Sequence, residues 1–187
     1  FYFTWGLVPA RLREAPVTVL TSMFLHGGIM HLGGNMLFLW IFGDNMEDEL
    51  GHAPFLGFYL AGGAVAALAQ VLADPNSTVP VVGASGAVAA VMGGYILLFP
   101  KARVDIFIFL VIIIRIVPLP AWLMLGLWFG LQLINGVVAD TTGGGVAYWA
   151  HAGGFIAGLL MVVPLWLKLG ATAFWKRNEG HPPLPEA

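Results

Sequence analysis

Cysteine is missing from the chain, and charged residues are scarce. Without cysteine the protein forms no disulfide bond and no thiolate metal site. The sequence also lacks a basic patch, a glycine-rich phosphate loop and a repeat of fixed period, so we expect no nucleic-acid or nucleotide partner. A metal site built from His26, His31 and His151 would need a carboxylate, but no Asp or Glu lies close in sequence and the His-Glu-x-x-His pattern is absent. We therefore expect no metal and no other cofactor.

What the chain does contain is mostly apolar. Of its 187 residues, 59% are hydrophobic and 10% are charged, and the mean hydropathy is +0.86. Values this far from those of a soluble domain indicate that the bilayer is the solvent. The sequence predicts an integral membrane protein of the all-α class, a polytopic transmembrane helix bundle surrounded by membrane lipid.

Five apolar stretches are predicted to cross the membrane as helices: residues 23–42, 53–73, 85–99, 121–138 and 147–167. Residues 105–117 are also apolar but too short to cross roughly 30 Å of hydrocarbon, so we expect a buried or re-entrant segment there. Residues 1–22 are mixed in character and are predicted to form an interfacial outer loop with short helical turns. The membrane domain then covers residues 23–168, and residues 169–187 are predicted to be a disordered cytoplasmic tail.

The helix rise places three polar side chains at one depth. At about 1.5 Å per residue, Ser85, His31 and His151 each lie about 24 to 26 Å from the charged residue that ends their helix. The positive-inside rule places that end, and with it the C-terminus, in the cytoplasm, because basic residues gather there. These residues are Lys101, Arg103, Lys168, Lys176 and Arg177. The three polar side chains then lie several Å below the outer membrane surface. Irregular backbone and polar groups at that depth require an aqueous pocket around them.

Ser85 stands among small residues at the head of the third apolar stretch. A lone hydroxyl in this setting is either a helix-packing group or a nucleophile. His151 at the same depth favours the nucleophile, because a neutral imidazole takes the proton that an attacking serine must lose. Asp140 lies in a glycine-rich loop outside the spans, so no acid is placed to complete a triad. We predict a Ser85–His151 dyad.

Acyl transfer also needs hydrogen-bond donors aimed at the developing oxyanion. His31 and Asn35 lie one helical turn apart and offer side-chain N–H groups from one helix face. Backbone N–H groups near Ser85 would add to this oxyanion hole. Supporting candidates are His26, Gly83 and Ala84.

Three further residues, His26, Trp128 and Gln132, have two interpretations each. His26 precedes the first predicted span and is interpreted as structural. Trp128 and Gln132 are also one turn apart. They either line a gate or take part in ordinary packing of the bundle.

Three motifs in this order resemble those of the rhomboid family of intramembrane serine proteases. They are the His...His-x-x-x-Asn pattern within residues 26–35, the Gly-x-Ser-Gly of residues 83–86, and His151 followed by Gly-x-x-x-Gly in residues 154–158. The resemblance extends over nearly the whole chain, from about Leu7 to Leu167.

The resemblance implies roles for the site residues. It makes Ser85 the nucleophile and His151 the general base, and it gives the oxyanion hole to His31 and Asn35 with the Ser85 amide. It implies a serine endopeptidase that cleaves transmembrane protein substrates near the outer membrane face. An inactive rhomboid-like protein that binds membrane helices is the alternative, and a small-solute channel is a third.

The chain departs from the family pattern in two respects. Rhomboids have six core helices and five are predicted here, so we expect that the family's first helix is missing from this sequence. Ala89, one turn after Ser85, replaces an aromatic residue that supports the histidine in some members. The position of His151 should then depend on other neighbours.

We expect a multi-pass protein of a bacterial inner (plasma) membrane.

Overall fold

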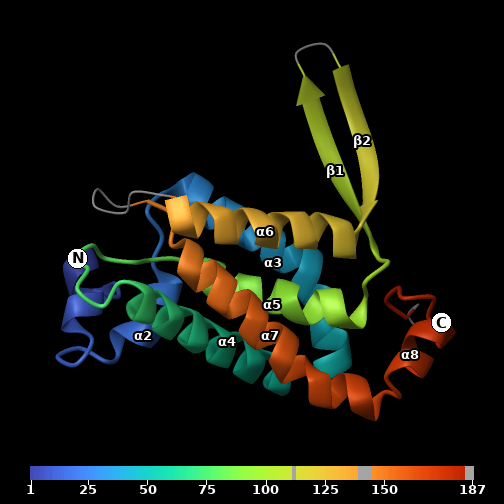
Figure 1. Cartoon of the computed structure of the whole chain (residues 1–187), viewed down its shortest axis with the longest axis horizontal. Helices are drawn as coiled ribbons and strands as arrows, with labels where there is room; N and C mark the ends of the chain where they lie inside the picture. Colours follow the sequence, from blue (N-terminus) through green and yellow to red (C-terminus); the bar gives the residue numbers. More distant parts are fainter. Residues whose placement is uncertain (111–112, 139–144, 184–187) are drawn as a thin grey trace.

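The computed structural model describes residues 1–110, 113–138 and 145–183. Within these residues, long helices form a bundle in which they run side by side (Figure 1). They are α3 (Ile29–Leu50), α4 (His52–Ala73), α5 (Ser85–Leu98), α6 (Ala121–Val138) and α7 (Tyr148–Lys168). Helix α5 lies in the middle and packs most extensively against α7 and α4. The all-α bundle is as the sequence predicts.

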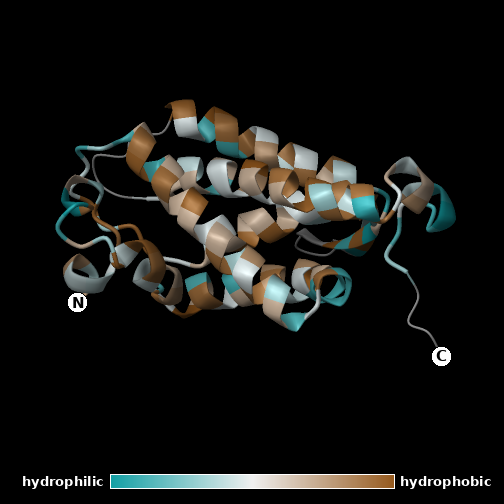
Figure 2. Ribbon diagram, turned by 90° about the horizontal axis from the view of Figure 1, so that it is seen from below, coloured by the Kyte–Doolittle hydropathy of each residue, from teal (hydrophilic) through white to brown (hydrophobic). Residues whose placement is uncertain are grey.

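Three of the described helices, α4, α6 and α7, are long and apolar enough to cross a membrane. Helix α5 is apolar but has only 14 residues. Helix α3 has 22 residues and ends in an acidic segment. Hydrophobic residues occur along all the long helices (Figure 2). Many of their side chains are exposed, among them Trp40, Leu72 and Val138, which are more than 70% exposed. The chain is therefore a multi-pass membrane protein, and the count of five spans stays a prediction.

Helix α5 is central because its residues are small. Glycine and alanine let the neighbouring backbones approach closely, which is how helices associate in lipid. A Cβ on Gly93 or Gly158 would overlap a backbone carbonyl of the facing helix, that of Phe155 or Ala90 respectively. These positions allow α5 and α7 to pack backbone to backbone.

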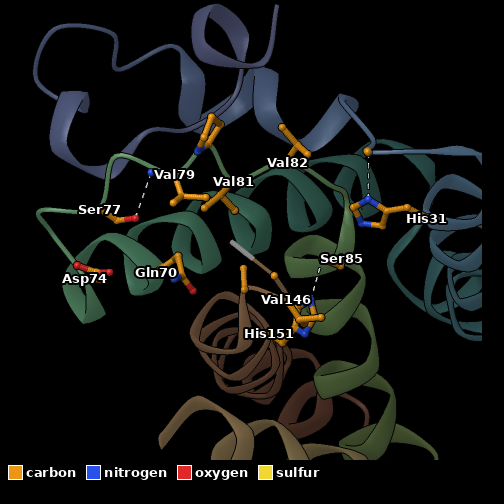
Figure 3. Close-up of a pocket in the computed structure, with 14 residues that line it drawn as sticks. His31, Gln70, Asp74, Ser77, Val79, Val81, Val82, Ser85, Val146 and His151 are labelled. Atoms are coloured by element: carbon orange, nitrogen blue, oxygen red, sulfur yellow. Dashed lines mark hydrogen bonds between the residues drawn. The ribbon is translucent and has the colours of Figure 1, made fainter. Parts of the chain in front are cut away.

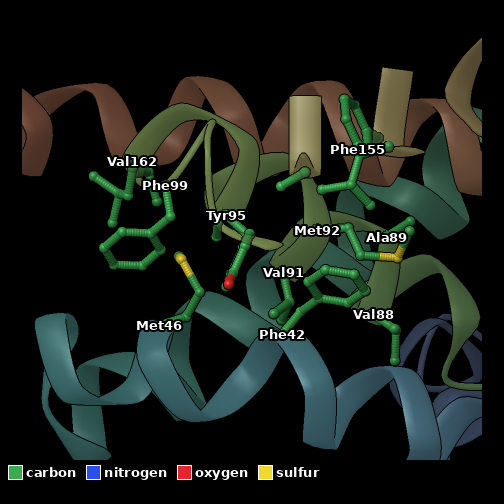
Figure 4. Close-up of a cluster of buried hydrophobic side chains, with 14 of the residues drawn as sticks. Phe42, Met46, Val88, Ala89, Val91, Met92, Tyr95, Phe99, Phe155 and Val162 are labelled. Atoms are coloured by element: carbon green, nitrogen blue, oxygen red, sulfur yellow. The ribbon is translucent and has the colours of Figure 1, made fainter. Parts of the chain in front are cut away.

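Aromatic side chains fill the core on the side of α5 that faces α3 (Figure 4). Phe42 from α3 meets Tyr95 edge to face, with ring centroids 5.0 Å apart, and Tyr95 meets Phe99 in the same manner at 5.2 Å. Edge-to-face pairs add about 0.5–1.5 kcal/mol each to the burial of the rings. This cluster holds α3 against the centre of the bundle.

Residues 103–110 and 113–120 form the two strands of a β-hairpin, so the prediction of a buried or re-entrant segment at residues 105–117 was wrong. Strand β1 (Arg103–Leu110) pairs antiparallel with β2 (Ile113–Pro120), from Arg103 opposite Pro120 to Leu110 opposite Ile113. The hairpin projects away from the bundle (Figure 1). The segment is rich in β-branched and aromatic residues, which favour strands over helix. It does not cross the bundle, because α5 ends and α6 begins at the same end.

The N-terminal segment consists of short helical turns, as predicted: α1 (Tyr2–Trp5), η1 (Pro9–Arg11), α2 (Thr18–Thr21) and η2 (Ser22–Phe24). This segment holds the loop that precedes α5. Leu7 and Val81 exchange both backbone hydrogen bonds, at 3.0 and 2.8 Å, and the Gly83 N–H donates to the Ser22 carbonyl at 2.9 Å. The irregular backbone before Ser85 is therefore paired with protein, as a non-helical segment at membrane depth must be.

The tail contains helix α8 (Thr172–Arg177), so the prediction of disorder from residue 169 was wrong for these residues. Phe174 is buried, at 3% exposure, and the Trp175 indole N–H donates to the Leu97 carbonyl at 2.9 Å. The polar composition of the tail concealed these two aromatic anchors. Residues 184–187 lie outside the described part of the chain.

Candidate active site

Ser85 is the first residue of α5 and is half-buried. Gly83 before it has a φ of +128°, a conformation that L side chains rarely adopt. A Cβ at Gly83 would also lie 2.8 Å from the His31 ring. Glycine is therefore required here on two counts, and it lets the imidazole of His31 approach the loop beside the serine. Ala84, also a supporting candidate, is buried between Gly83 and Ser85.

His151 lies in the first turn of α7, opposite Ser85 (Figure 3). Its Nε2 atom is 2.8 Å from Ser85 Oγ, within hydrogen-bond distance. The two helices come this close because Gly154, one turn after His151, faces the backbone of Gly86, where any Cβ would overlap the Gly86 carbonyl. The structure thus brings together the serine and the histidine that the sequence singled out.

Two residues of α6 hold the far side of the imidazole. His151 Nδ1 is 2.8 Å from Gln132 Oε1. The Trp128 indole lies over the imidazole, with ring centroids 5.8 Å apart and planes tilted by 32°. The sequence suggested a gate or simple packing for this pair and missed its contact with the histidine. Ala89 contributes no aromatic contact, and the imidazole contacts Gln132 and Trp128 instead.

His31 and Asn35 lie near the start of α3, on the other side of the serine. The Gly27 N–H donates to His31 Nδ1 at 3.2 Å. Since Nδ1 accepts this bond, a neutral His31 carries its proton on Nε2 and can donate from that atom. Asn35 Nδ2 donates to the His31 carbonyl at 2.8 Å. One amide proton of the buried Asn35 is therefore engaged within its own helix, and a second remains.

His26 packs edge to face against His31, with ring centroids 5.2 Å apart and an angle of 71° between the planes. The Tyr2 hydroxyl donates to the His26 carbonyl at 2.9 Å. These contacts fit the structural role that the sequence suggested for His26. It supports the ring of His31 and does not itself line either cavity at the serine.

Two cavities meet at the serine–histidine pair. The first, about 440 Å³, lies under the loop from Asp74 to Val82 and extends to Ser85, His31 and His151 (Figure 3). The second, about 250 Å³, is mostly apolar and lies between α3 and α6. It also contacts Ser85, His31 and His151, and it adds Asn35 and Trp128. The larger cavity has the scale of a small-ligand site.

Asp140 lies outside the described residues. Gln70 of α4 is a further residue that the sequence analysis missed. Its Oε1 accepts the Ala150 N–H at 3.2 Å, and its side chain is 8% exposed. This bond satisfies one of the free N–H groups in the first turn of α7 and ties the start of that helix to α4.

The structure is thus a multi-pass helix bundle in which a serine and a histidine lie within hydrogen-bond distance at the same end of two packed helices. The sequence model of the rhomboid domain matches residues 13–168. The chain therefore belongs to the rhomboid family.

Curated relatives come from bacteria and mitochondria. The chain is 34% identical to rhomboid protease GluP of Bacillus subtilis over 161 residues, which are 85% of the chain and 28% of that protein. It is 31% identical to mitochondrial rhomboid protein 1 of Saccharomyces cerevisiae over 153 residues, 77% of the chain and 40% of that protein. It is 25% identical to the human mitochondrial presenilin-associated rhomboid-like protein over 169 residues, 86% of the chain and 40% of that protein. The chain thus spans less than half the length of these relatives.

Proposed function

We propose that the protein is an intramembrane serine endopeptidase that cleaves transmembrane protein substrates, with Ser85 as nucleophile and His151 as general base. The observation that carries the proposal is the 2.8 Å contact between Ser85 Oγ and His151 Nε2, at the junction of two cavities. Membership of the rhomboid family supports it. So does the 34% identity to a relative that is named a protease.

In the first half of the reaction, Ser85 Oγ attacks the scissile carbonyl carbon while its proton passes to His151 Nε2. The carbonyl oxygen becomes an oxyanion as the new C–O bond forms. Collapse of this intermediate breaks the C–N bond, and the proton on His151 Nε2 passes to the departing amine. The product is an ester between Ser85 and the acyl part of the substrate.

The oxyanion needs donors that already point at it. His31 Nε2–H is one, because Nδ1 of the same ring accepts the Gly27 N–H. The Ser85 amide is a second, since the first N–H groups of a helix have no acceptor within that helix. The remaining amide proton of Asn35 is a third, supported by the place of Asn35 in the cavity that contacts Ser85.

Hydrolysis of the ester needs water at the same place. The cavity of about 440 Å³ includes polar side chains of Gln70, Asp74 and Ser77, so it offers water the partners that an apolar void lacks. His151 takes a proton from this water, hydroxide attacks the ester, and Ser85 leaves with the proton from His151. The enzyme returns to its starting state.

We also propose that the C-terminus is cytoplasmic and that the dyad lies near the outer membrane face. Helices α3, α5 and α7 begin at the end of the bundle opposite the hairpin and α8 (Figure 1). The positive-inside rule supports this orientation, since Lys101, Lys168 and Lys176 belong to the hairpin end. A bacterial inner (plasma) membrane stays a prediction, because the relatives are both bacterial and mitochondrial.

Cleavage of a model transmembrane substrate by the purified chain in liposomes tests the proposal. We expect Ser85→Ala to reduce cleavage to background with an unchanged melting temperature, because a methyl replaces a hydroxyl among small residues. Equal cleavage by the variant would end the protease proposal. A folded wild-type chain that binds the substrate without cutting it would instead favour the inactive, helix-binding alternative.

A further inference from the structure

We infer that Gln132 is a positioning residue for His151, the third member of a Ser85–His151–Gln132 triad in which a neutral amide stands where soluble serine proteases have a carboxylate. The inference rests on the proposed function and goes beyond it, because a dyad alone does not explain what orients the imidazole. It is carried by the 2.8 Å contact between His151 Nδ1 and Gln132 Oε1.

The setting of Gln132 in α6 points to a specific partner. Its neighbours Leu131 and Leu133 are 55% and 37% exposed on the outside of the bundle, whereas Gln132 is only 8% exposed. A polar side chain in a membrane span is costly unless it finds a hydrogen-bond partner inside the bundle. Gln132 finds one on the ring nitrogen that faces away from the serine. This position is the one that a triad's third member occupies.

The contact selects one tautomer of the imidazole. For Ser85 to donate its proton, His151 Nε2 must carry a lone pair, so the single proton of the neutral ring lies on Nδ1. That N–H then needs an acceptor, and Gln132 Oε1 is in place. When the ring gains a second proton during the reaction, the same bond holds the imidazolium in its orientation.

An amide also suits the bilayer better than a carboxylate does. A buried carboxylate has a large desolvation penalty when it stays ionised, and in a membrane span that penalty is greater still. A glutamine keeps the acceptor oxygen without the charge. Trp128, one turn earlier on α6, lies over the ring, so the same helix restricts both the plane of the imidazole and its rotation. Helix α6 thereby supplies the support that Ala89 does not.

Three variants of the full chain test the role of Gln132. Gln132→Leu keeps the size and removes the acceptor, and Gln132→Glu keeps an acceptor and adds charge. Thr18→Val is the control, because Thr18 is also a buried polar residue, at 3% exposure, but its hydroxyl donates to the Ala15 carbonyl at 2.6 Å and its side chain lines neither cavity at the serine. The measurements are the melting temperature and the rate at which a fluorophosphonate labels the protein, from pH 5 to pH 9.

We expect Gln132→Leu to slow labelling by about 10²-fold, the scale of a catalytic group displaced by about 1 Å. Thr18→Val should lower the melting temperature but label at the wild-type rate. Gln132→Glu should label within a few-fold of wild type, with its pH profile displaced to higher pH because a carboxylate stabilises the protonated ring. His31 and Asp74 also line the cavity beside His151, and they are unchanged in all three variants.

The inference is overturned if folded Gln132→Leu labels within twofold of wild type. It is overturned equally if Gln132→Leu and Thr18→Val slow labelling by the same factor and Gln132→Glu does not restore the rate, since Gln132 would then be only structural. Should Gln132→Leu fail to fold, the pH profile of Gln132→Glu decides alone. A profile displaced to higher pH supports the contact with the imidazole, and a wild-type profile overturns it. Absence of labelling in the wild type would instead contradict the proposed function itself.

Discussion

At the scale of single residues, His31 and Asn35 are expected to stabilise the transition state by different amounts. The His31 Nε2 proton is free for the oxyanion because Nδ1 is engaged with the Gly27 N–H. One of the two Asn35 amide protons is already donated to the His31 carbonyl. His31 is therefore the stronger donor candidate, and Asn35 combines a structural bond with a remaining donor.

We predict that His31→Ala lowers kcat by about 10²- to 10³-fold, or roughly 2.7–4 kcal/mol, with KM little changed, as for the loss of one oxyanion donor. Asn35→Ala should lower kcat less and also lower the melting temperature, because a helix hydrogen bond in a membrane protein contributes about 0.6–2 kcal/mol. Steady-state cleavage kinetics and thermal melts on the same preparations measure both effects. Ile29→Ala, at an 84% exposed position on the same helix, is the control. A normal kcat in both site variants would remove His31 and Asn35 from the mechanism.

At the scale of helices and strands, the close packing of α5 and α7 is the feature on which the site geometry depends. We predict that Gly158→Ala destabilises the protein by about 1–3 kcal/mol, because the new methyl overlaps the Ala90 carbonyl of α5. Gly126→Ala on α6 is the matched control, since nothing lies within 4 Å of its Cβ position. It should leave the melting temperature unchanged or slightly raised. Equal melting temperatures for both variants would contradict the packing described here.

Some features of the helices and strands could be predicted from the sequence, and others could not. Depth counting along the apolar helices was enough to place Ser85 and His151 at the same level, because a regular rise converts residue number into height. The contact of Gln132 with His151 was beyond such counting, since height says nothing of which helices are neighbours. The hairpin at residues 103–120 was missed because a short apolar run is compatible with a buried helix or a strand until its pairing partner is known.

At the scale of the whole molecule, the orientation in the membrane is testable because the chain has no cysteine. Asn76→Cys lies in the exposed loop between α4 and α5, and Ala173→Cys lies on the exposed side of α8. A membrane-impermeant maleimide should label Asn76→Cys in intact cells and label Ala173→Cys only after the membrane is permeabilised. The reverse pattern would invert the proposed orientation and place the dyad on the cytoplasmic side.

The most direct test of the central claim, that Ser85 is an activated nucleophile, is the site and stoichiometry of fluorophosphonate labelling. The folded wild-type chain should gain one adduct, mapped by peptide mass spectrometry to Ser85, because His151 Nε2 lies 2.8 Å from the hydroxyl oxygen and accepts its proton. Ser85→Ala and His151→Ala should both remain unlabelled at their normal melting temperatures. An unlabelled wild type, an adduct on another residue, or full labelling of Ser85 in His151→Ala would contradict the account.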